Sequence, residues 1–219
     1  MIIAIDGPAA SGKSTTAKLL AEKMNLLYID TGAMYRAVAL YLKENNIQTD
    51  DFLSLEASLE RINLNFQVTD KTNHIIMNNV NVSDKIRTPE ITKLSSEIAK
   101  IRIIRQKMVE MQRALAKDHN VILEGRDIGT VVFPDAQFKF FLQATLDARS
   151  TRRFDEAKKL GQVVDFDEIK QDLIWRDLND SQREEAPLKK PTDAVELDTT
   201  NMTIDGQVNF ILNYIRRRI

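Results

Sequence analysis

The residues Gly7-Pro8-Ala9-Ala10-Ser11-Gly12-Lys13-Ser14, followed by Thr15, decide the fold of this chain. Two glycines with four residues between them, then lysine and serine, have the spacing of a phosphate-binding loop. Residues 1–5 form an apolar run that predicts a buried strand, and residues 14–25 predict the helix after the loop. The glycines allow backbone N–H groups to turn inward on phosphates at the positive end of that helix.

The side chains of this phosphate-binding loop, defined here as residues 7–15, suit a nucleotide with magnesium. We expect Lys13 to reach the outer phosphates and Ser14 to hold the magnesium ion. A lysine at a helix N-terminus opposes the helix dipole unless an anion lies between, so its position favours a polyanionic ligand. The alternative is a glycine-rich turn that only starts a helix. Four fixed positions match by chance in a chain this long on the order of once in a hundred sequences, which favours phosphate binding.

The composition argues against several classes of function. The chain has 31 basic and 32 acidic residues and a net charge of −1, which gives no electrostatic case for nonspecific nucleic-acid binding. Without cysteine, and with only His74 and His119, it has no disulfide, and neither a histidine-rich metal centre nor a Ser/His/Asp triad is expected. No charged leader precedes an apolar segment, and no apolar run is long enough to span a bilayer. We therefore expect a cytoplasmic protein with neither nucleic-acid nor membrane partners.

Hydrophobic periodicity predicts alternating strands and helices over most of the chain. Further strands are expected at 26–29, 121–124, 138–142 and 194–197, and helices at 30–45, 51–62, 101–117, 147–160, 165–183 and 204–218. One more helix is expected to start at Thr88-Pro89-Glu90, with threonine as its cap. Between 64 and 82 the pattern changes to period two, with turns at 70–73 and 78–79. This segment predicts a small antiparallel three-stranded sheet inserted into the α/β core.

The arginines in two of the predicted helices are best explained in different ways. Arg36 lies in the first turn of the helix at 30–45, where an arginine opposes the dipole unless an anion is bound, so it is a candidate phosphate ligand. Its neighbour Tyr35 is more simply explained by packing. Three arginines of the helix at 101–117 fit a solvated amphipathic face: Arg102, Arg105 and Arg113.

A second group of arginines lies in the helix predicted at 147–160. Arg149, Arg152 and Arg153 have i, i+3 and i+4 spacing, which places them in one cationic patch. Such a patch could contact bound phosphates. The alternative is pairing at the surface with the nearby acidic residues Asp147, Asp155 and Glu156.

The strand at 121–124 ends on an acidic residue, Glu124, which is followed by Gly125-Arg126-Asp127. In an open parallel sheet, ligands gather outside the carboxyl ends of the strands, so these side chains are expected to face the same crevice as Lys13. Glu124 could orient the water shell of magnesium, or it could form an ion pair with Lys13 or Arg126. The sequence does not separate these two roles.

Longer stretches carry a resemblance to one family. They are Ile5-Asp6-Gly7-Pro8, Asp30-Thr31-Gly32-Ala33-Met34-Tyr35-Arg36, Ile86-Arg87-Thr88, the run 124–134 (EGRDIGTVVFP), the cluster at 149–153, Arg176-Asp177, Asp180, Arg183 and Ala186-Pro187-Leu188. Through them the chain resembles the bacterial cytidylate kinases, of the nucleoside monophosphate kinase group, over almost its full length. The phosphate-binding loop alone identifies only a superfamily, and the run 124–134 with the inserted sheet is far more discriminating. Thr31 stands where the family has serine, and it keeps the hydroxyl.

The resemblance implies an α/β fold with a five-stranded parallel sheet, helices on both faces, a small inserted antiparallel β domain and a helical lid. Residues 1–219 would form a single P-loop kinase domain, with a monophosphate-binding insertion at 63–87 and the lid at 149–163. ATP would bind at residues 7–15 as phosphoryl donor, with Mg2+ as cofactor. A monomer is expected.

The same resemblance implies ATP-dependent phosphorylation of CMP and dCMP, with UMP a poorer acceptor. Residues implied in the acceptor site are Thr31, Tyr35, Arg36, Ser96, Arg105, Arg126, Asp127, Arg176, Asp180 and Arg183. Those implied in catalysis are Lys13, Arg126, Arg149, Arg153 and Arg183. The acceptor would be a phosphate oxygen that is already anionic, so a histidine-poor chain with many arginines suits this chemistry.

Within the implied acceptor site, we expect Asp180 to accept hydrogen bonds from ribose hydroxyls. Ser96, Arg105 and Asp127 are expected to contact one pyrimidine ring. Asp127 has an alternative role, in which it pairs with Arg126 or Arg105 and only holds the arginine in place.

Three other classes of protein are weighed against a CMP kinase. A GTPase switch would have an Asn-Lys-x-Asp motif, and the sequence has none. A small P-loop kinase for another nucleotide or a nonnucleotide acceptor is the nearer alternative. A nonenzymatic nucleotide-binding module is the third, and it would show no ATP turnover that depends on an added acceptor.

Overall fold

The computed structural model describes residues 1–69 and 72–219. Of the turn predicted at 70–73, Asp70 and Lys71 lie outside the described residues. The chain forms two compact units, one of residues 1–28 and 119–219 and the other of residues 29–118. We call them the first and the second unit.

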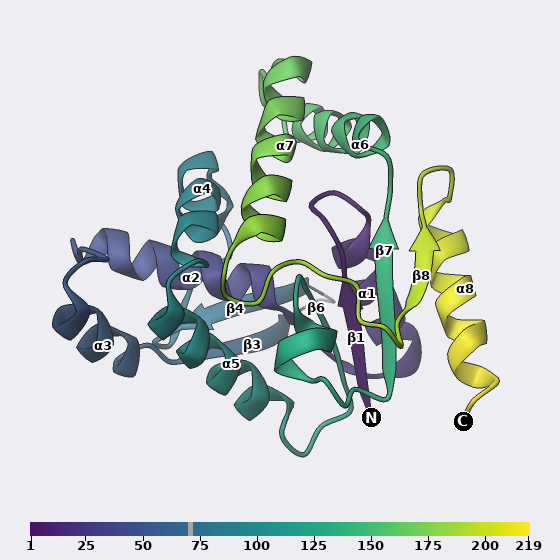
Figure 1. Ribbon diagram of the computed structural model, residues 1–219, viewed down its shortest axis with the longest axis horizontal. Coiled ribbons are helices and arrows are strands. Elements are labelled where there is room, and N and C mark those ends of the chain that lie inside the picture. Colours follow the sequence, from purple (N-terminus) through teal and green to yellow (C-terminus); the bar gives the residue numbers. More distant parts are fainter. Residues whose placement is uncertain (70–71) are drawn as a thin grey trace. The chain divides into compact units, whose positions relative to one another are not determined.

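The first unit is built around β1 (Ile2–Asp6), the middle strand of a five-stranded parallel sheet (Figure 1). The strand order is β2-β6-β1-β7-β8, with β2 (Leu27–Asp30), β6 (Val121–Gly125), β7 (Phe138–Gln143) and β8 (Val195–Asp198). Residue Ile3 pairs with Ile122 on one side and with Phe138 on the other. The predicted fold class, an α/β fold with a parallel sheet, is confirmed.

Alternate residues of these strands form a hydrophobic core with two helices, α1 (Lys13–Met24) and α8 (Ile204–Arg216). Ile3, Ile5 and Phe140 meet Leu20 of α1 and Ile211 of α8 in this core. Alternate residues of a strand point to opposite faces, so Ala4 and Asp6 face away from it. On that side lies η2 (Ile128–Val132), a π-helical turn that directly follows β6.

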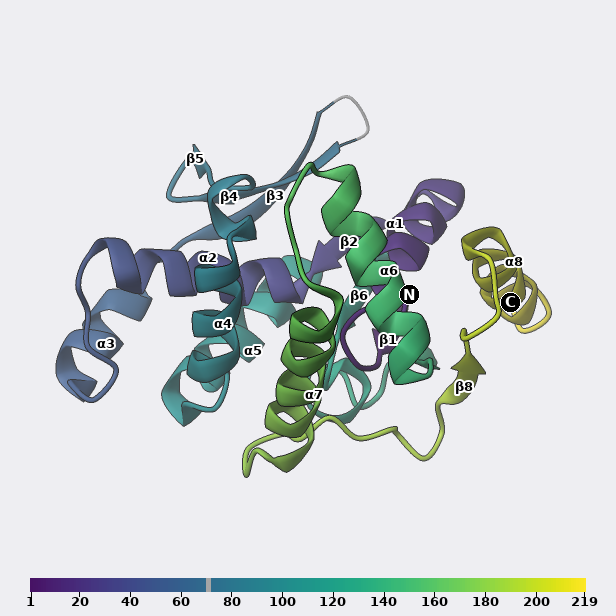
Figure 2. The same cartoon turned by 90° about the horizontal axis from the view of Figure 1, so that it is seen from above.

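Two further helices of the first unit, α6 (Leu146–Lys159) and α7 (Phe166–Gln182), pack against each other (Figures 1 and 2). Phe154 and Phe166 form an edge-to-face pair with centroids 5.6 Å apart. Thr145 and Asp165 start the two helices, because their side chains accept hydrogen bonds from backbone N–H groups of the first turn.

The second unit contains α2 (Thr31–Glu44), α3 (Phe52–Glu60), α4 (Pro89–Ile98), α5 (Arg102–Ala116) and the short 3-10 helix η1 (Lys85–Arg87). Its antiparallel sheet consists of β3 (Leu64–Thr69), β4 (Thr72–Met77) and β5 (Val80–Asn81). The predicted three-stranded sheet is therefore confirmed. That residues 63–87 form a monophosphate-binding insertion stays a prediction.

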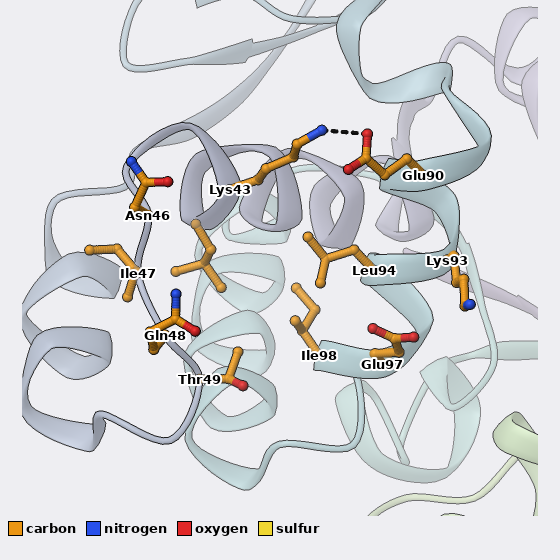
Figure 3. Close-up of a pocket in the computed structure, with 11 residues that line it drawn as sticks. Lys43, Asn46, Ile47, Gln48, Thr49, Glu90, Lys93, Leu94, Glu97 and Ile98 are labelled. Atoms are coloured by element: carbon orange, nitrogen blue, oxygen red, sulfur yellow. Dashed lines mark hydrogen bonds and ion pairs between the residues drawn. The ribbon is translucent and has the colours of Figure 1, made fainter.

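A pocket of the second unit lies between the C-terminal part of α2, the residues after it and α4. Figure 3 shows Leu94 and Ile98 of α4 on one side of the pocket and Ile47 on the other, with an ion pair between Lys43 and Glu90 at the edge. The residues that line this pocket include none of the predicted site residues. The pocket therefore lies apart from the chemistry that the sequence indicates.

The boundaries predicted from periodicity agree with the structure within two residues for every strand and helix with stated bounds. The helix predicted at 204–218, for example, ends at Arg216. Two short elements were not predicted, η1 and η2, because neither is long enough to show a hydrophobic period. Over residues 1–69 and 72–219, none of the helices has the length and apolar character that crossing a bilayer requires.

Candidate active site

The phosphate-binding loop joins the end of β1 to the start of α1, as predicted. Gly12 caps α1 with a φ of 94°, in the left-handed region that favours glycine. A Cβ at Gly7 would lie 2.0 Å from the carbonyl oxygen of Leu142, so no other residue fits at that point of the sheet. The buried hydroxyl oxygen of Ser11 has no hydrogen-bond partner among the residues that the structure describes. A buried hydroxyl without a partner, in a loop of this shape, fits contact with a phosphate oxygen.

Lys13 is the buried cation of this loop, with 4% of its surface exposed. Its Nζ donates a hydrogen bond of 2.7 Å to the carbonyl oxygen of Pro8. Burial, together with the positive charge of Arg126, lowers the pKa of Lys13 to about 7, against the attraction of Glu124 and Asp180. A bound polyphosphate would add negative charge and hold the lysine in its ammonium form.

Two of the three arginines in α6 contact the backbone of the loop. Arg149 is buried; its Nη1 donates to the carbonyl oxygen of Ala9 at 3.2 Å, and its Nη2 lies 2.7 Å from Asp177. Arg152 Nη1 donates to the carbonyl oxygen of Ala10 at 3.5 Å. These contacts bring two guanidinium groups to the backbone of the phosphate-binding loop.

The third arginine of the group, Arg153, is different. Its guanidinium is partly exposed and lies 2.7 Å from Glu156, one turn along the same helix. Pairing at the surface, which the sequence left open for the whole group, therefore describes Arg153 but not Arg149. The spacing predicted that all three arginines lie close together on the helix. It did not show which of them are buried in the folded unit.

A cluster of three arginines and two aspartates lies at the end of β6 and in the C-terminal part of α7. Arg126 Nε donates to Asp180 at 2.6 Å, and Arg183 lies 3.6 Å from Asp127 and 4.0 Å from Asp180. Burial alone would raise the pKa of Asp180, but the positive charges of Arg126, Arg183 and Arg176 hold it below its usual range. Asp180 also raises the pKa of Arg126, against burial. The ion pair between Arg126 and Asp180 therefore stays charged at neutral pH.

The structure also places Glu124, for which the sequence left two roles open. Tyr28 Oη lies 3.0 Å from a Glu124 carboxylate oxygen and donates a hydrogen bond to it. The negative charge of Glu124 is one of those that raise the pKa of Lys13. Glu124 is thus fixed at the carboxyl end of β6 and within electrostatic reach of Lys13.

Two of the predicted residues of the second unit, Thr31 and Arg36, lie in the first turns of α2. Thr31 is buried at the start of this helix. Asp30 caps the helix by accepting from the backbone N–H of Ala33 at 2.8 Å, and Arg36 Nη2 donates to the same carboxylate at 3.4 Å. The Asp30 carboxylate offsets the unfavourable dipole position of Arg36, so that position no longer argues by itself for a bound anion.

Tyr35, Arg105 and Ser96 are the other predicted residues of this unit. The guanidinium carbon of Arg105 lies 5.9 Å from the centroid of the Tyr35 ring, in a cation–π arrangement. Arg105 Nη1 donates to the carbonyl oxygen of Ala99 at 3.1 Å, and Ser96 Oγ donates to the carbonyl oxygen of Thr92 at 3.3 Å. The arginine and the ring are therefore held together inside the unit.

For Arg105 the expectation of a solvated face was wrong. Arg102 and Arg113 are exposed, whereas Arg105 is 4% exposed. Its position three residues before Met108 places it on the buried face of α5, because residues three apart in a helix lie on one side. This spacing is the signal that could have identified it.

The family model for cytidylate kinase matches residues 3–217. The chain belongs to the cytidylate kinase family. Its relatives include the cytidylate kinases of Fusobacterium nucleatum, 50% identical over 217 residues (99% of this chain and 98% of the relative), and of Thermosipho melanesiensis, 44% identical over 216 residues (99% and 97%). A crystal structure of an uncharacterized protein from Eubacterium ventriosum shares the fold, with a TM-score of 0.53 at 16% identity over 100% of this chain and 99% of the other.

Membership of the cytidylate kinase family makes the chain a phosphotransferase of the nucleoside monophosphate kinase class. Three residues to which the sequence analysis gave no role make long-range contacts in the first unit of this family member. Thr199 Oγ1 donates to the carbonyl oxygen of Ser11 at 2.9 Å, and Gln207 Oε1 accepts from Thr16 Oγ1 at 2.8 Å. These contacts join residues 188 and 191 positions apart, so no local pattern could have shown them.

The third is Asp6, the last residue of β1, which is 1% exposed. One carboxylate oxygen accepts from the backbone N–H of Ile128 at 2.8 Å and the other from that of Gly129 at 2.7 Å. Burial, with a smaller contribution from the negative charge of Asp127, raises the pKa of Asp6 from 3.8 to about 6. A charged residue at the end of an otherwise apolar strand was the available signal.

This shift predicts how stability depends on pH. Between pH 3.8 and about 6 the folded chain binds more protons at Asp6 than the unfolded chain does, so the contribution of Asp6 falls as pH rises and is constant above that range. The free energy of unfolding of the parent minus that of Asp6→Asn should therefore drop by about 2 kcal/mol between pH 4 and pH 6.5. Urea unfolding of both proteins at several pH values measures it. A difference that does not change with pH would contradict the shift.

Proposed function

We propose that this member of the cytidylate kinase family transfers the γ-phosphoryl group of ATP to CMP and dCMP, and to UMP less efficiently. The name of the relatives, cytidylate kinase, supports CMP as acceptor. The structural observation that carries the proposal is the buried Lys13, with a pKa of about 7, in a loop whose neighbouring cations contact its backbone. Such a site has positive charge to place against phosphates and no competing carboxylate in the loop itself.

The donor site is assigned to residues 7–15. Their backbone N–H groups and the buried Ser11 hydroxyl would surround the phosphates, and Lys13 would follow the γ-phosphoryl group during transfer. Ser14, in the first turn of α1 and exposed, fits as a magnesium ligand. Among the described residues, no group of three acidic or histidine side chains could hold a metal ion, which suits an ion held mainly by phosphates and one hydroxyl. Bound magnesium would neutralise charge on the β and γ phosphates.

The reaction needs no side chain as general base. An anionic oxygen of the CMP phosphate attacks the γ-phosphorus, the bond from that phosphorus to the bridging oxygen of ADP breaks, and CDP and ADP result. Because the negative charge is spread over the transferred group, guanidinium groups stabilise the transition state. Arg126, Arg149 and Arg183 are assigned this task together with Lys13. Arg153, which pairs with Glu156 at the surface, is assigned to it from the family resemblance alone.

In the first unit, the cluster around Asp180 is assigned to the acceptor. Arg126, Arg176 and Arg183 supply positive charge for the monophosphate, and Asp180, kept ionised by these arginines, would accept hydrogen bonds from ribose hydroxyls. Asp127 would accept a hydrogen bond from the cytosine amino group.

In the second unit, Thr31, Tyr35 and Arg36 are assigned to the monophosphate, and Ser96 and Arg105 to the base. The five donor N–H groups of Arg105 can serve the carbonyl oxygen and ring nitrogen of a pyrimidine. Its cation–π partner Tyr35 limits the positions that this guanidinium can take.

Base choice gives a prediction for Asp127. Cytosine has an amino donor where uracil has a carbonyl acceptor, so an ionised Asp127 attracts the first and repels the second. In the parent, kcat/KM for CMP should be about five- to 150-fold higher than kcat/KM for UMP. In Asp127→Ala this ratio should fall toward one. Asp127→Asn is the matched control for shape, because its amide can face either base. If both substitutions lower the two activities equally and keep the ratio, Asp127 only positions Arg183.

The proposal as a whole is tested by product formation. ATP and magnesium should give ADP in an amount that depends on added CMP, with CDP as the second product. Release of ADP without any acceptor dependence would count against a kinase. The monomeric state and the cytoplasmic location stay predictions.

A further inference from the structure

Asp6 makes a pair of contacts that the donor and acceptor assignments above do not use. Its two carboxylate oxygens accept from two successive backbone N–H groups, of Ile128 and Gly129, at 2.8 and 2.7 Å. A carboxylate this deeply buried is costly unless hydrogen bonds satisfy it. An apolar residue in the last position of a buried strand would avoid that cost, so the acid needs a reason.

The two amides belong to the segment that carries Arg126 and Asp127. They lie at the start of η2, where the first N–H groups of a helical turn have no partner within the turn. The carbonyl oxygen of Asp127 in turn accepts from the N–H groups of Val131 and Val132, at 2.9 and 3.2 Å. Asp6 therefore fixes the backbone directly after Asp127, and η2 fixes the carbonyl group of the same residue.

Packing on the other side restricts the same turn. A Cβ at Gly129 would lie 2.9 Å from Cγ of Pro191 and 3.3 Å from Oδ2 of Asp6, so the turn is enclosed between these two residues. Lys139 of β7 also borders this glycine. The turn cannot shift toward Pro191 to compensate for a lost contact with Asp6.

Asp6 also directly precedes Gly7, the first residue of the phosphate-binding loop. The end of β1 thus leads into the loop that we assign to the donor. The Asp6 side chain at the same strand end holds the segment that we assign to the acceptor. Both parts belong to the first unit.

We propose that Asp6 is a positioning residue, which sets Arg126 and Asp127 relative to the phosphate-binding loop so that acceptor and donor are aligned. This inference rests on the proposed function for its effect on catalysis. Both carboxylate oxygens are needed, because each accepts from a different amide. An amide side chain would present an NH2 group to one of these two N–H donors.

The test compares Asp6→Asn and Asp6→Ala with the parent. Misalignment of the acceptor residues should lower kcat/KM for CMP on the order of 10- to 100-fold, with Asp6→Asn the less affected, and should reduce the CMP-to-UMP ratio. Affinity for ATP, measured by calorimetry without acceptor, should stay within about threefold of the parent's. A residue that only positions the acceptor segment should affect alignment in the transition state and not the binding of the donor. Asp51→Ala is the control: its carboxylate caps α3 by accepting from the N–H of Ser54 at 3.1 Å, and its loss should affect stability only.

Two kinetic or binding results would overturn the inference. One is a folded Asp6→Asn variant with unchanged kcat/KM and an unchanged ratio, which would make the contact purely structural. The other is loss of ATP binding in parallel with activity, which would place the role of Asp6 in the loop.

A measurement without turnover separates this inference from the proposed function. Amide hydrogen exchange should be slow at Ile128 and Gly129 in the parent and at least tenfold faster in Asp6→Asn, with protection kept in β6 and β7. Unchanged exchange at these two amides would overturn the positioning role even if CMP is phosphorylated. Failure of the parent to phosphorylate CMP, with the exchange result as expected, would instead overturn the proposed function and leave the anchoring of η2 supported.

Discussion

Lys13→Ala should lose phosphoryl transfer by about 100- to 1,000-fold in kcat while the protein stays folded. The size of this loss is that of removing one preorganised charge or donor that faces the charge of the transition state. The fold should survive because alanine favours the helix that starts here, and because burying the lysine already disfavours its charged form, as its pKa of about 7 shows. Initial rates with ATP, magnesium and CMP, alongside thermal unfolding, give both quantities.

Lys18→Ala is the matched control for this prediction. Lys18 lies in the same helix but is exposed, so its removal changes net charge equally and should leave turnover unchanged. Unchanged turnover in a folded Lys13→Ala protein would contradict the assignment of residues 7–15 to the donor.

Arg149→Met should lower kcat by about 100-fold and change the KM for CMP by less than about threefold. The guanidinium is buried and contacts the loop backbone through Ala9, so it is placed to act on charge that develops during transfer rather than on the bound acceptor. Methionine keeps most of the length of the side chain. Because its removal leaves Asp177 without this partner, Arg149→Met combined with Asp177→Asn separates loss of charge from loss of stability.

Lys170→Met is the control for α6 and α7. Lys170 is a partly exposed cation that pairs with Asp147 at 2.7 Å, so the variant breaks an ordinary surface ion pair and should leave kcat unchanged. If Arg149→Met changes only the free energy of unfolding, as the control does, then Arg149 has a structural role and the assignment to catalysis is wrong.

Much of the fold could be predicted from local patterns. The loop 7–15 predicts a strand before it and a helix after it, and period-two residues at 64–82 predict the antiparallel sheet. These features depend on neighbours in sequence, which is why their boundaries agree so closely with the structure. The π-helical turn at Ile128–Val132 had no such signal.

The site was harder to predict because its contacts join distant parts of the chain. Arg149 and Arg153 lie one turn apart in the same helix, yet only Arg149 is covered, since α7 supplies Asp177. Spacing tells which side chains share a face but not what packs against that face. Asp6 likewise depends on amides more than 120 positions away, so its role could only come from coordinates.

The most direct test of the central claim is an acceptor panel with the purified protein, ATP and magnesium. CMP, dCMP, UMP, AMP and shikimate are compared by kcat/KM, with ADP and the phosphorylated product both measured. The account predicts the highest values for CMP and dCMP, a lower value for UMP, and no product above background for AMP or shikimate. A higher value for AMP, UMP or shikimate than for CMP would contradict it.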